Sequence, residues 1–282
     1  MSSGAEFTTP DGRRVPAVTA DEMREVDRVA TDEVGVGLLQ MMEHAGRNLA
    51  REALAMTEEA GGSDGPIVVA AGDGGNGGGG LCAARHLLNR SQDVRIVLDR
   101  PADELHGAAA EQWSVLEAMG VTAVTPGGDE PSAITVANAD ADLVIDALVG
   151  YGLSGALRGT AADLVAGFGE HRVLSLDVPS GVDATTGEAP KTTTDETPKT
   201  TTDETPGVAA APARTLTLAL PKTGLAACGS DLVLADIGLP RVVFERAGVE
   251  YPEPGPFAGT AAEQGRETDD GYRVPLTVDR AE

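Results

Sequence analysis

The sequence predicts an α/β protein with three layers, in which helices cover both faces of a mostly parallel central sheet. Two observations carry this prediction. Short apolar runs rich in β-branched residues alternate with segments of helical periodicity, which is the pattern of βαβ units. The first of these runs, residues 67–71, leads through a glycine-rich turn into a helix-forming segment, a layout typical of phosphate-binding turns. We expect one domain over residues 17–247.

Local signals place the predicted helices. Thr19 and Glu22 form a capping box that starts a first helix, and a second helix runs from about residue 38 to 56. Met41 and Met42 of the second helix are expected in the core, because methionine fills irregular gaps between packed elements. Three further helices are predicted over about 81–89, 102–119 and 161–168.

The predicted strands are short and apolar. They span residues 67–71, 94–98, 121–124, 143–146, 173–177, 214–220 and 232–235. Residues 1–16 are interpreted as a polar arm, and residues 248–282 as an acidic tail, rich in proline and glycine, with little regular structure. Residues 190–205 contain the same octapeptide twice, with no apolar residue other than proline. We interpret them as a disordered insertion in a surface loop.

The composition excludes several function classes. With 282 residues and 41% apolar residues, the chain is long enough for a substantial core, but its net charge is −24. Such an acidic surface repels nucleic acids and anionic membranes, and it resembles the lysine-poor surfaces of halophilic proteins. The two cysteines fit a reducing cytoplasm. The start of the chain shows no secretory signal, no run is long enough to span a membrane, and the four histidines lack zinc-ligand spacing.

The glycine-rich turn has two interpretations. Gly72, Gly74 and Gly77 match the dinucleotide fingerprint, and Asp99 ends the next predicted strand, where a ribose-binding acid is expected. Glycines there would let backbone N–H groups approach a phosphate and adopt positive φ. A run this rich in glycine also matches many spacings by chance, so a flexible turn is the alternative.

Polar residues follow three of the predicted strands, and parallel strands bring such residues to one side of the sheet. The first strand leads to Asn76, the 143–146 strand ends in Asp146, and the 173–177 strand leads to Asp177 and Ser180. Their oxygens could hold a hard cation, and one carboxylate could transfer protons. The alternative is that Asp146 and Asp177 are helix caps or turn residues.

Several motifs, in a fixed order, resemble those of the YjeF N-terminal domain family, the NAD(P)H-hydrate epimerases. The resemblance covers roughly residues 17–247. In chain order its motifs are residues 41–46 (MMEHAG), 72–87 (GDGGNGGGGLCAARHL), 146–153 (DALVGYGL), 176–183 (LDVPSGVD), 221–225 (PKTGL) and 236–240 (DIGLP).

The resemblance implies a Rossmann-like fold and a role in coenzyme repair. Members interconvert the R and S forms of NAD(P)H hydrated at C6 of the nicotinamide ring, so that a separate dehydratase can restore the coenzyme, and they are typically homodimers. The family binds potassium, here expected at Asn76, Asp146 and Ser180. Asp177 is the expected catalytic acid or base. The coenzyme is expected to contact Asp177 and two glycine-rich segments: Gly75, Asn76, Gly77, Gly78 and Gly79, and Gly150, Tyr151, Gly152, Leu153, Ser154, Gly155 and Ala156.

The sequence departs from the family pattern at two positions of the first loop. Gly75 replaces the usual asparagine and Gly79 the usual aspartate, which removes polar contacts to a ligand. Two alternatives therefore stay open. One is an NAD-dependent dehydrogenase, suggested by the glycine turn and Asp99, although it leaves the Asp146 and Asp177 motifs unexplained. The other is a non-catalytic nucleotide-binding or interaction module on the same fold.

Overall fold

A computed structural model describes residues 6–62, 65–125, 140–191, 207–259 and 271–279. Ten strands of these residues form one sheet, in the order β2-β1-β10-β9-β8-β7-β6-β3-β4-β5. Its parallel part contains β3 (Ile67–Ala71), β4 (Val94–Leu98), β5 (Ala123–Val124), β6 (Leu143–Ala147), β7 (Val173–Leu176), β8 (Arg214–Leu218) and β9 (Asp231–Ala235). The predicted α/β fold with a mostly parallel sheet is confirmed.

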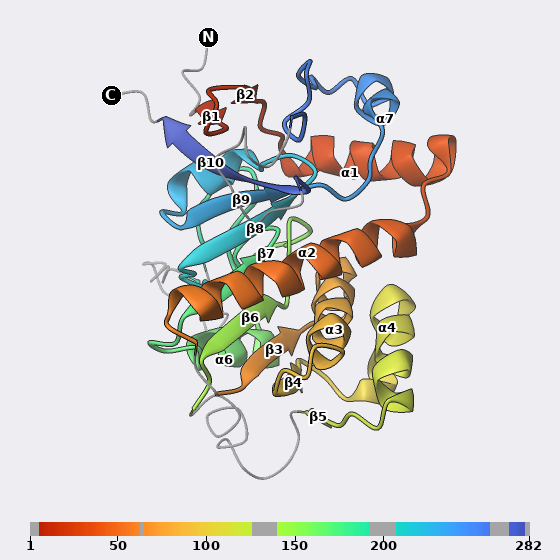
Figure 1. Ribbon diagram of the computed structural model, residues 1–282. Coiled ribbons are helices and arrows are strands. Elements are labelled where there is room, and N and C mark those ends of the chain that lie inside the picture. The colour runs from red at the N-terminus through yellow and green to blue at the C-terminus, as the bar shows by residue number, and fades with distance from the viewer. Residues whose placement is uncertain (1–5, 63–64, 126–139, 192–206, 260–270, 280–282) are drawn as a thin grey trace, which may run out of the picture.

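Helices cover both faces of the parallel strands (Figure 1). On one face lie α2 (Leu38–Glu59), α3 (Gly75–Leu88) and α4 (Gly107–Ala118), and on the other lies α6 (Gly159–Ala166). Side chains alternate along β3: Ile67, Val69 and Ala71 pack with α2, α3 and α4, whereas Val68 and Ala70 pack with α6. This two-sided burial explains why the central strands are continuous apolar runs rather than alternating ones.

The glycine-rich segment is helical, which corrects the predicted loop. α3 begins at Gly75, not near residue 81, and none of the glycines from 72 to 80 has a positive φ. They permit close packing instead: a Cβ on Gly77 would lie 1.7 Å from the carbonyl oxygen of Gly72, and one on Gly80 would lie 2.5 Å from the Cβ of Ala147. The glycines thus let the start of α3 lie directly against the turn after β3 and against β6.

The two ends of the chain contain strands that the sequence analysis did not predict. β1 (Glu6–Thr8) and β2 (Arg14–Val15) come from the proposed arm, and β10 (Arg273–Asp279) from the proposed tail. β10 joins β9 and β1 in antiparallel pairs, so these strands extend the sheet beyond β9. α7 (Arg241–Arg246) precedes the tail. The repeat at 190–205 lies outside the described residues except for its first two positions.

The N-terminal helix completes the domain. α1 (Ala20–Arg28) begins at the predicted capping box, in which Thr19 and Glu22 bond each other's backbone N–H groups, and continues as a π-helical segment, Val29–Val34. Met23 and Val26 belong to the same buried apolar cluster as Val178 and Leu220, which follow the carboxyl ends of β7 and β8. No helix in the described ranges is long and apolar enough to cross a membrane.

Candidate functional site

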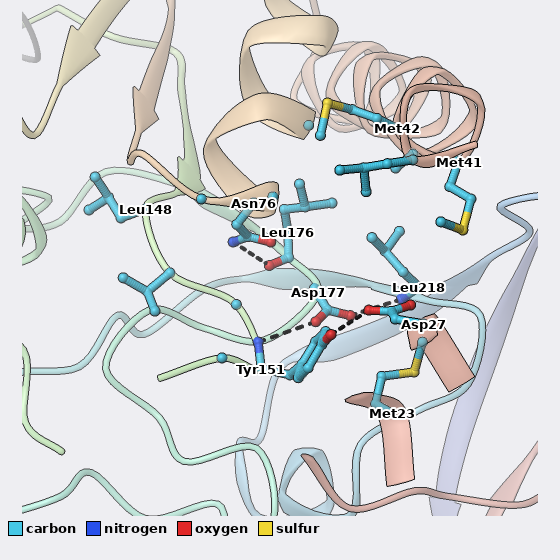
Figure 2. Close-up of a pocket in the computed structure, with 18 of the residues that line it drawn as sticks. Met23, Asp27, Met41, Met42, Asn76, Leu148, Tyr151, Leu176, Asp177 and Leu218 are labelled. Atoms are coloured by element: carbon cyan, nitrogen blue, oxygen red, sulfur yellow. Dashed lines mark hydrogen bonds between the residues drawn. The ribbon is translucent and has the colours of Figure 1, made fainter. Parts of the chain in front are cut away.

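A cavity of about 570 Å³ opens at the carboxyl ends of β3, β6 and β7 (Figure 2). Its size is that of a typical small-molecule pocket. Gly75 and Asn76 of α3, Gly150 after β6 and Asp177 after β7 line it, and α1 and α2 add apolar side chains such as Met42. The cavity therefore lies where ligands bind in open α/β sheets.

Asp177 is fixed at the base of this cavity. It directly follows β7 and adopts a left-handed backbone conformation with φ of 67°, which aspartate tolerates better than most residues. Its Oδ2 accepts a bond from the backbone N–H of Tyr151 at 3.4 Å, and its Oδ1 one from that of Leu218 at 3.2 Å. Only 3% of the residue is exposed. The carboxylate is held in one orientation by groups from two other strand ends.

A buried ammonium group completes this arrangement. Lys222 is fully buried, and its Nζ donates to Oδ1 of Asp177 and, at 2.9 Å, to the carbonyl oxygen of Leu218. The same Nζ lies 5.8 Å from the centre of the Tyr151 ring. The ammonium group and two backbone N–H groups thus all direct hydrogen-bond donors at this carboxylate. The pair therefore presents a fixed anion to the cavity.

A second carboxyl group faces the cavity from α1. Asp27 is half-buried, and its Oδ2 accepts a hydrogen bond from the hydroxyl of Tyr151. Burial raises the pKa of Asp27 above its ordinary value, and this outweighs the hydrogen bond from Tyr151, which lowers it. The pKa of the Tyr151 hydroxyl is raised as well, mainly by burial and then by the charge of Asp27. Tyr151 thus contacts Asp177 through its backbone and Asp27 through its side chain.

The three residues expected to hold a cation lie close together but differ in access. Asp146 is fully buried: its two oxygens accept from the hydroxyl of Ser175 at 2.7 Å, from both N–H and hydroxyl of Ser180, and weakly from the N–H of Leu148 at 3.4 Å. Burial raises its pKa, and these bonds oppose the shift. Asn76 lines the cavity and donates to the carbonyl oxygen of Leu176 at 3.1 Å. Asp146 and Ser180 lie behind the cavity wall.

The expected coenzyme contacts divide in the same way. Among them, Gly75, Asn76, Gly79, Gly150, Tyr151, Gly152 and Asp177 line the cavity. Gly77 and Gly78 are buried inside the packing of α3, and Leu153, Ser154, Gly155 and Ala156 are absent from the described lining. Asp99 does line the cavity, but its carboxylate pairs with Arg100, whose guanidinium also binds Asp73 at 3.0 Å.

The sequence analysis gave no site role to five charged residues of the cavity wall: Arg24, Asp27, Asp73, Arg100 and Lys222. Lys222 carried a usable signal, because the chain has three lysines and two of them belong to the repeat at 190–205. Asp27 follows Met23 by four residues and Val26 by one, so it borders the apolar stripe of α1. That position identifies a half-buried acid, but not the cavity that it faces.

A separate cluster of metal-ligand types lies between α2 and α3. Nε2 of His86 is 2.8 Å from Oε1 of Glu43, and Sγ of Cys82 is 3.5 Å from Oε2. The histidine spacing in the sequence did not indicate this cluster. The guanidinium of Arg85 binds both Glu43 and Cys82, and burial raises the pKa of the Cys82 thiol to about 12. Arginine therefore already supplies the positive charge at this position.

Comparison with known proteins identifies relatives of the chain. Residues 38–224 match the family described as YjeF-related protein N-terminus. An NAD(P)H-hydrate epimerase of Dehalogenimonas lykanthroporepellens is 42% identical over 249 residues, which cover 87% of this chain and 91% of the relative. A bifunctional NAD(P)H-hydrate repair enzyme of Moorella thermoacetica is 32% identical over 79% of this chain, which spans 41% of that longer protein. The crystal structure of the yeast protein ynu0 matches with a TM-score of 0.65 at 20% identity, over 89% of this chain and 98% of the other.

Proposed function

The chain belongs to the YjeF-related N-terminal family, and on that premise we propose that it is an NAD(P)H-hydrate epimerase, an isomerase of coenzyme repair. It interconverts the R and S forms of NAD(P)H hydrated at C6 of the nicotinamide ring. The observation that carries this proposal is the fixed carboxylate of Asp177 in a cavity that the glycine-rich start of α3 also lines. A dehydratase that accepts one form would consume the product.

The start of α3 suits the phosphates of a dinucleotide. Gly75 and Asn76 occupy the first positions of the helix, where backbone N–H groups are unpaired and the helix dipole favours negative charge. A Cβ on Gly75 would meet no heavy atom within 4 Å, so a ligand can approach the backbone there. The absence of the usual loop asparagine and aspartate at Gly75 and Gly79 leaves this binding to backbone groups.

Asp177 is proposed to act at C6. Epimerisation breaks the bond between C6 and its hydroxyl oxygen and forms a new one with water on the other face of the ring. In the intermediate, the ring nitrogen and C6 share a positive charge. The fixed anion of Asp177 stabilises that charge, and its carboxylate accepts the proton that the incoming water loses.

The direct test supplies the R epimer together with an excess of an S-specific dehydratase and measures NADH recovery with and without this protein. We expect faster recovery with the protein, and no acceleration by an Asp177→Asn variant that circular dichroism shows to be folded under the assay conditions. Equal recovery with and without the wild-type protein would contradict the proposal. Oxidation of a substrate alcohol with hydride transfer to the coenzyme would favour a dehydrogenase instead, although Asp99 is already paired with Arg100.

Potassium is proposed as the cofactor of this reaction. The expected ligand atoms of Asn76, Asp146 and Ser180 are oxygens, which a hard cation prefers. The amide nitrogen of Asn76 bonds Leu176, and its Oδ1 receives no hydrogen bond from the described residues. Gly150 leaves room beside that oxygen, since a Cβ there would lie 2.8 Å from it. Asn76 would hold the ion at the cavity wall, and Asp146 and Ser180, the other two expected ligands, lie behind that wall. Bound there, a cation would help to orient the coenzyme.

Replacing potassium with tetramethylammonium at constant ionic strength tests the cofactor. We expect the epimerisation rate to fall and to recover when potassium is added back, and we expect Ser180→Ala to weaken that recovery. A rate that is independent of potassium would contradict the assignment. The expected homodimer also stays a proposal, which sedimentation equilibrium of the full chain would test.

A further inference from the structure

Loss of the C6 hydroxyl requires a proton. The inference that follows concerns the source of that proton and rests on the proposed function. Hydroxide is a poor leaving group, so the oxygen departs as water after it receives a proton. The two electrons of the broken bond leave with that oxygen, and the lone pair of the ring nitrogen forms the double bond to C6. When water adds back, it loses one proton, so the complete reaction consumes none.

Asp177 is poorly suited to donate this proton. Its Oδ1 accepts from the ammonium group of Lys222 and from the N–H of Leu218, and its Oδ2 accepts from the N–H of Tyr151. Each of these bonds stabilises the charged carboxylate, and a neutral carboxyl group would leave the buried ammonium group unpaired. Asp177 is therefore held as the partner of an ammonium group, and another group has to supply the first proton.

Two other acids of the cavity wall, Asp99 and Asp73, form ion pairs with Arg100. Asp99 pairs with the Nε of Arg100 at 3.0 Å, and Asp73 pairs with a terminal nitrogen of the same guanidinium. Asp73 also accepts from the backbone N–H of His106, and these interactions lower its pKa. Within the described lining, Asp27 is the remaining carboxyl group, and it pairs with a neutral hydroxyl instead of a cation.

The surroundings of Asp27 favour a bound proton. Burial is the largest influence and raises its pKa, the negative charge of Asp177 raises it further, and the Tyr151 hydroxyl and the ammonium group of Lys222 lower it. The positive charge of Arg24, on the same helix, lowers the pKa of the Tyr151 hydroxyl, but burial and the charge of Asp27 outweigh it. Figure 2 shows the Asp27 carboxyl group beside that of Asp177, with the Tyr151 ring next to both. One pocket thus holds two carboxyl groups with different surroundings, a pattern typical of acid and base pairs.

We propose that Asp27 is a second catalytic residue, which donates the proton with which the C6 hydroxyl leaves as water, while Asp177 receives the proton of the water that returns. The Tyr151 hydroxyl positions the Asp27 carboxyl group. In the opposite direction of the reaction the two carboxyl groups exchange roles. Proton exchange with solvent restores the pair after each turnover.

The test measures kcat and KM for the R epimer in the coupled assay across a pH series. Asp27→Asn keeps the shape of the side chain but cannot donate a carboxyl proton, and we expect kcat to fall by about 10²- to 10⁴-fold with KM changed far less. Asp27→Glu should restore part of the rate. Asp32→Asn, which removes an exposed acid five residues further along, is the matched control and should behave as wild type.

The Tyr151→Phe variant separates a proton donor from a structural residue. It keeps the backbone N–H that binds Asp177 but removes the hydroxyl that lowers the pKa of Asp27. The alkaline limb of the pH profile, which reports the proton on the acid, should therefore move to higher pH. This shift is not expected if Asp27 only supports the fold.

The outcomes distinguish this inference from the proposed function. An inactive wild-type protein overturns the proposed function and the role of Asp27 together. With an active wild type, the role of Asp27 alone is overturned in three cases: Asp27→Asn keeps its kcat, the alkaline limb stays in place in Tyr151→Phe, or Tyr151→Phe loses as much rate as Asp27→Asn. The last result would make Tyr151 the donor.

Discussion

Lys222 and Asp177 stabilise each other only as a pair, because each is buried with little access to water. Removing one charge leaves the other uncompensated in a low-dielectric environment. We expect Lys222→Met to lower the free energy of unfolding by about 3–5 kcal/mol. Adding Asp177→Asn to that variant should recover part of the loss, because it removes the unpaired charge. Urea unfolding of the wild type, both single variants and the double variant measures this coupling. Additive losses would show that the two groups do not depend on each other.

Asp27 is expected to reduce stability at neutral pH. Its pKa in the folded protein lies above the ordinary value of 3.8, so the folded state binds the proton more tightly than the unfolded chain does. The stability contributed by Asp27 is therefore complete below about pH 3.8 and is lost as the pH rises through the folded-state pKa. We expect Asp27→Asn to melt at a higher temperature than wild type at pH 8, with the difference vanishing near pH 4.

Asp32→Asn controls for the loss of one negative charge, since Asp32 is exposed. A difference between Asp27→Asn and wild type that is independent of pH would contradict the raised pKa. Together with the kinetic test, a gain in stability would show that the residue is kept for its chemistry.

At the scale of single residues, the sequence predicted the groups that follow strands. Asn76 and Asp177 could be placed together because parallel strands end on one side of a sheet, a rule that needs no coordinates. Asp27 and Lys222 could not be placed in the same way. Asp27 reaches the cavity because α1 packs across strand ends more than a hundred residues away, and this long-range packing leaves no local signal.

α3 owes its position to glycines that differ in what surrounds them. Gly75 is exposed at the first helical position, with free space where a Cβ would lie, whereas a Cβ on Gly77 would overlap the backbone of Gly72. Alanine is the better helix former by about 0.5–1 kcal/mol. We therefore expect Gly75→Ala to keep or slightly raise the free energy of unfolding, and Gly77→Ala to lower it by roughly 4 kcal/mol or more.

Urea unfolding followed by circular dichroism compares the two variants, each with a single added methyl group. Similar unfolding midpoints would contradict the packing role assigned to Gly77. Such a result would favour the alternative interpretation from the sequence, in which this glycine-rich segment is a flexible turn.

The sequence predicted the parallel strands and missed the antiparallel ones for a physical reason. A strand buried on both faces is a continuous apolar run, as in β3, and it is recognisable without its partners. β1 and β10 are stabilised by each other: Phe7 pairs with Val278 across nearly the whole length of the chain. Short strands of this kind depend on their partners, and the charged and proline-rich sequence around them conceals the alternation of Val274, Leu276 and Val278.

The whole molecule carries a net charge of −24, with 45 acidic residues against 21 lysines and arginines. Many of the arginines already form ion pairs with acidic residues. The acids outnumber all the lysines and arginines, so the acids in excess of these pairs repel one another across the surface. The screening length falls from about 10 Å at 0.1 M salt to about 3 Å at 1 M. We propose that the protein is adapted to high salt and expect its Tm to rise with KCl. A gain of about 3 kcal/mol would raise Tm by roughly 6–12 °C.

The shape of this salt dependence separates screening from other effects of salt. Screening is nearly complete by about 1 M, whereas the strengthening of apolar burial by salt continues to grow with concentration. We therefore expect most of the rise in Tm below 1 M. Glu111 and Glu117 are exposed on α4, and reversing both charges with Glu111→Lys and Glu117→Lys should raise Tm in dilute buffer and flatten its dependence on KCl. A Tm that is equal in dilute and multimolar KCl would show that repulsion among the acids does not limit the stability of this fold.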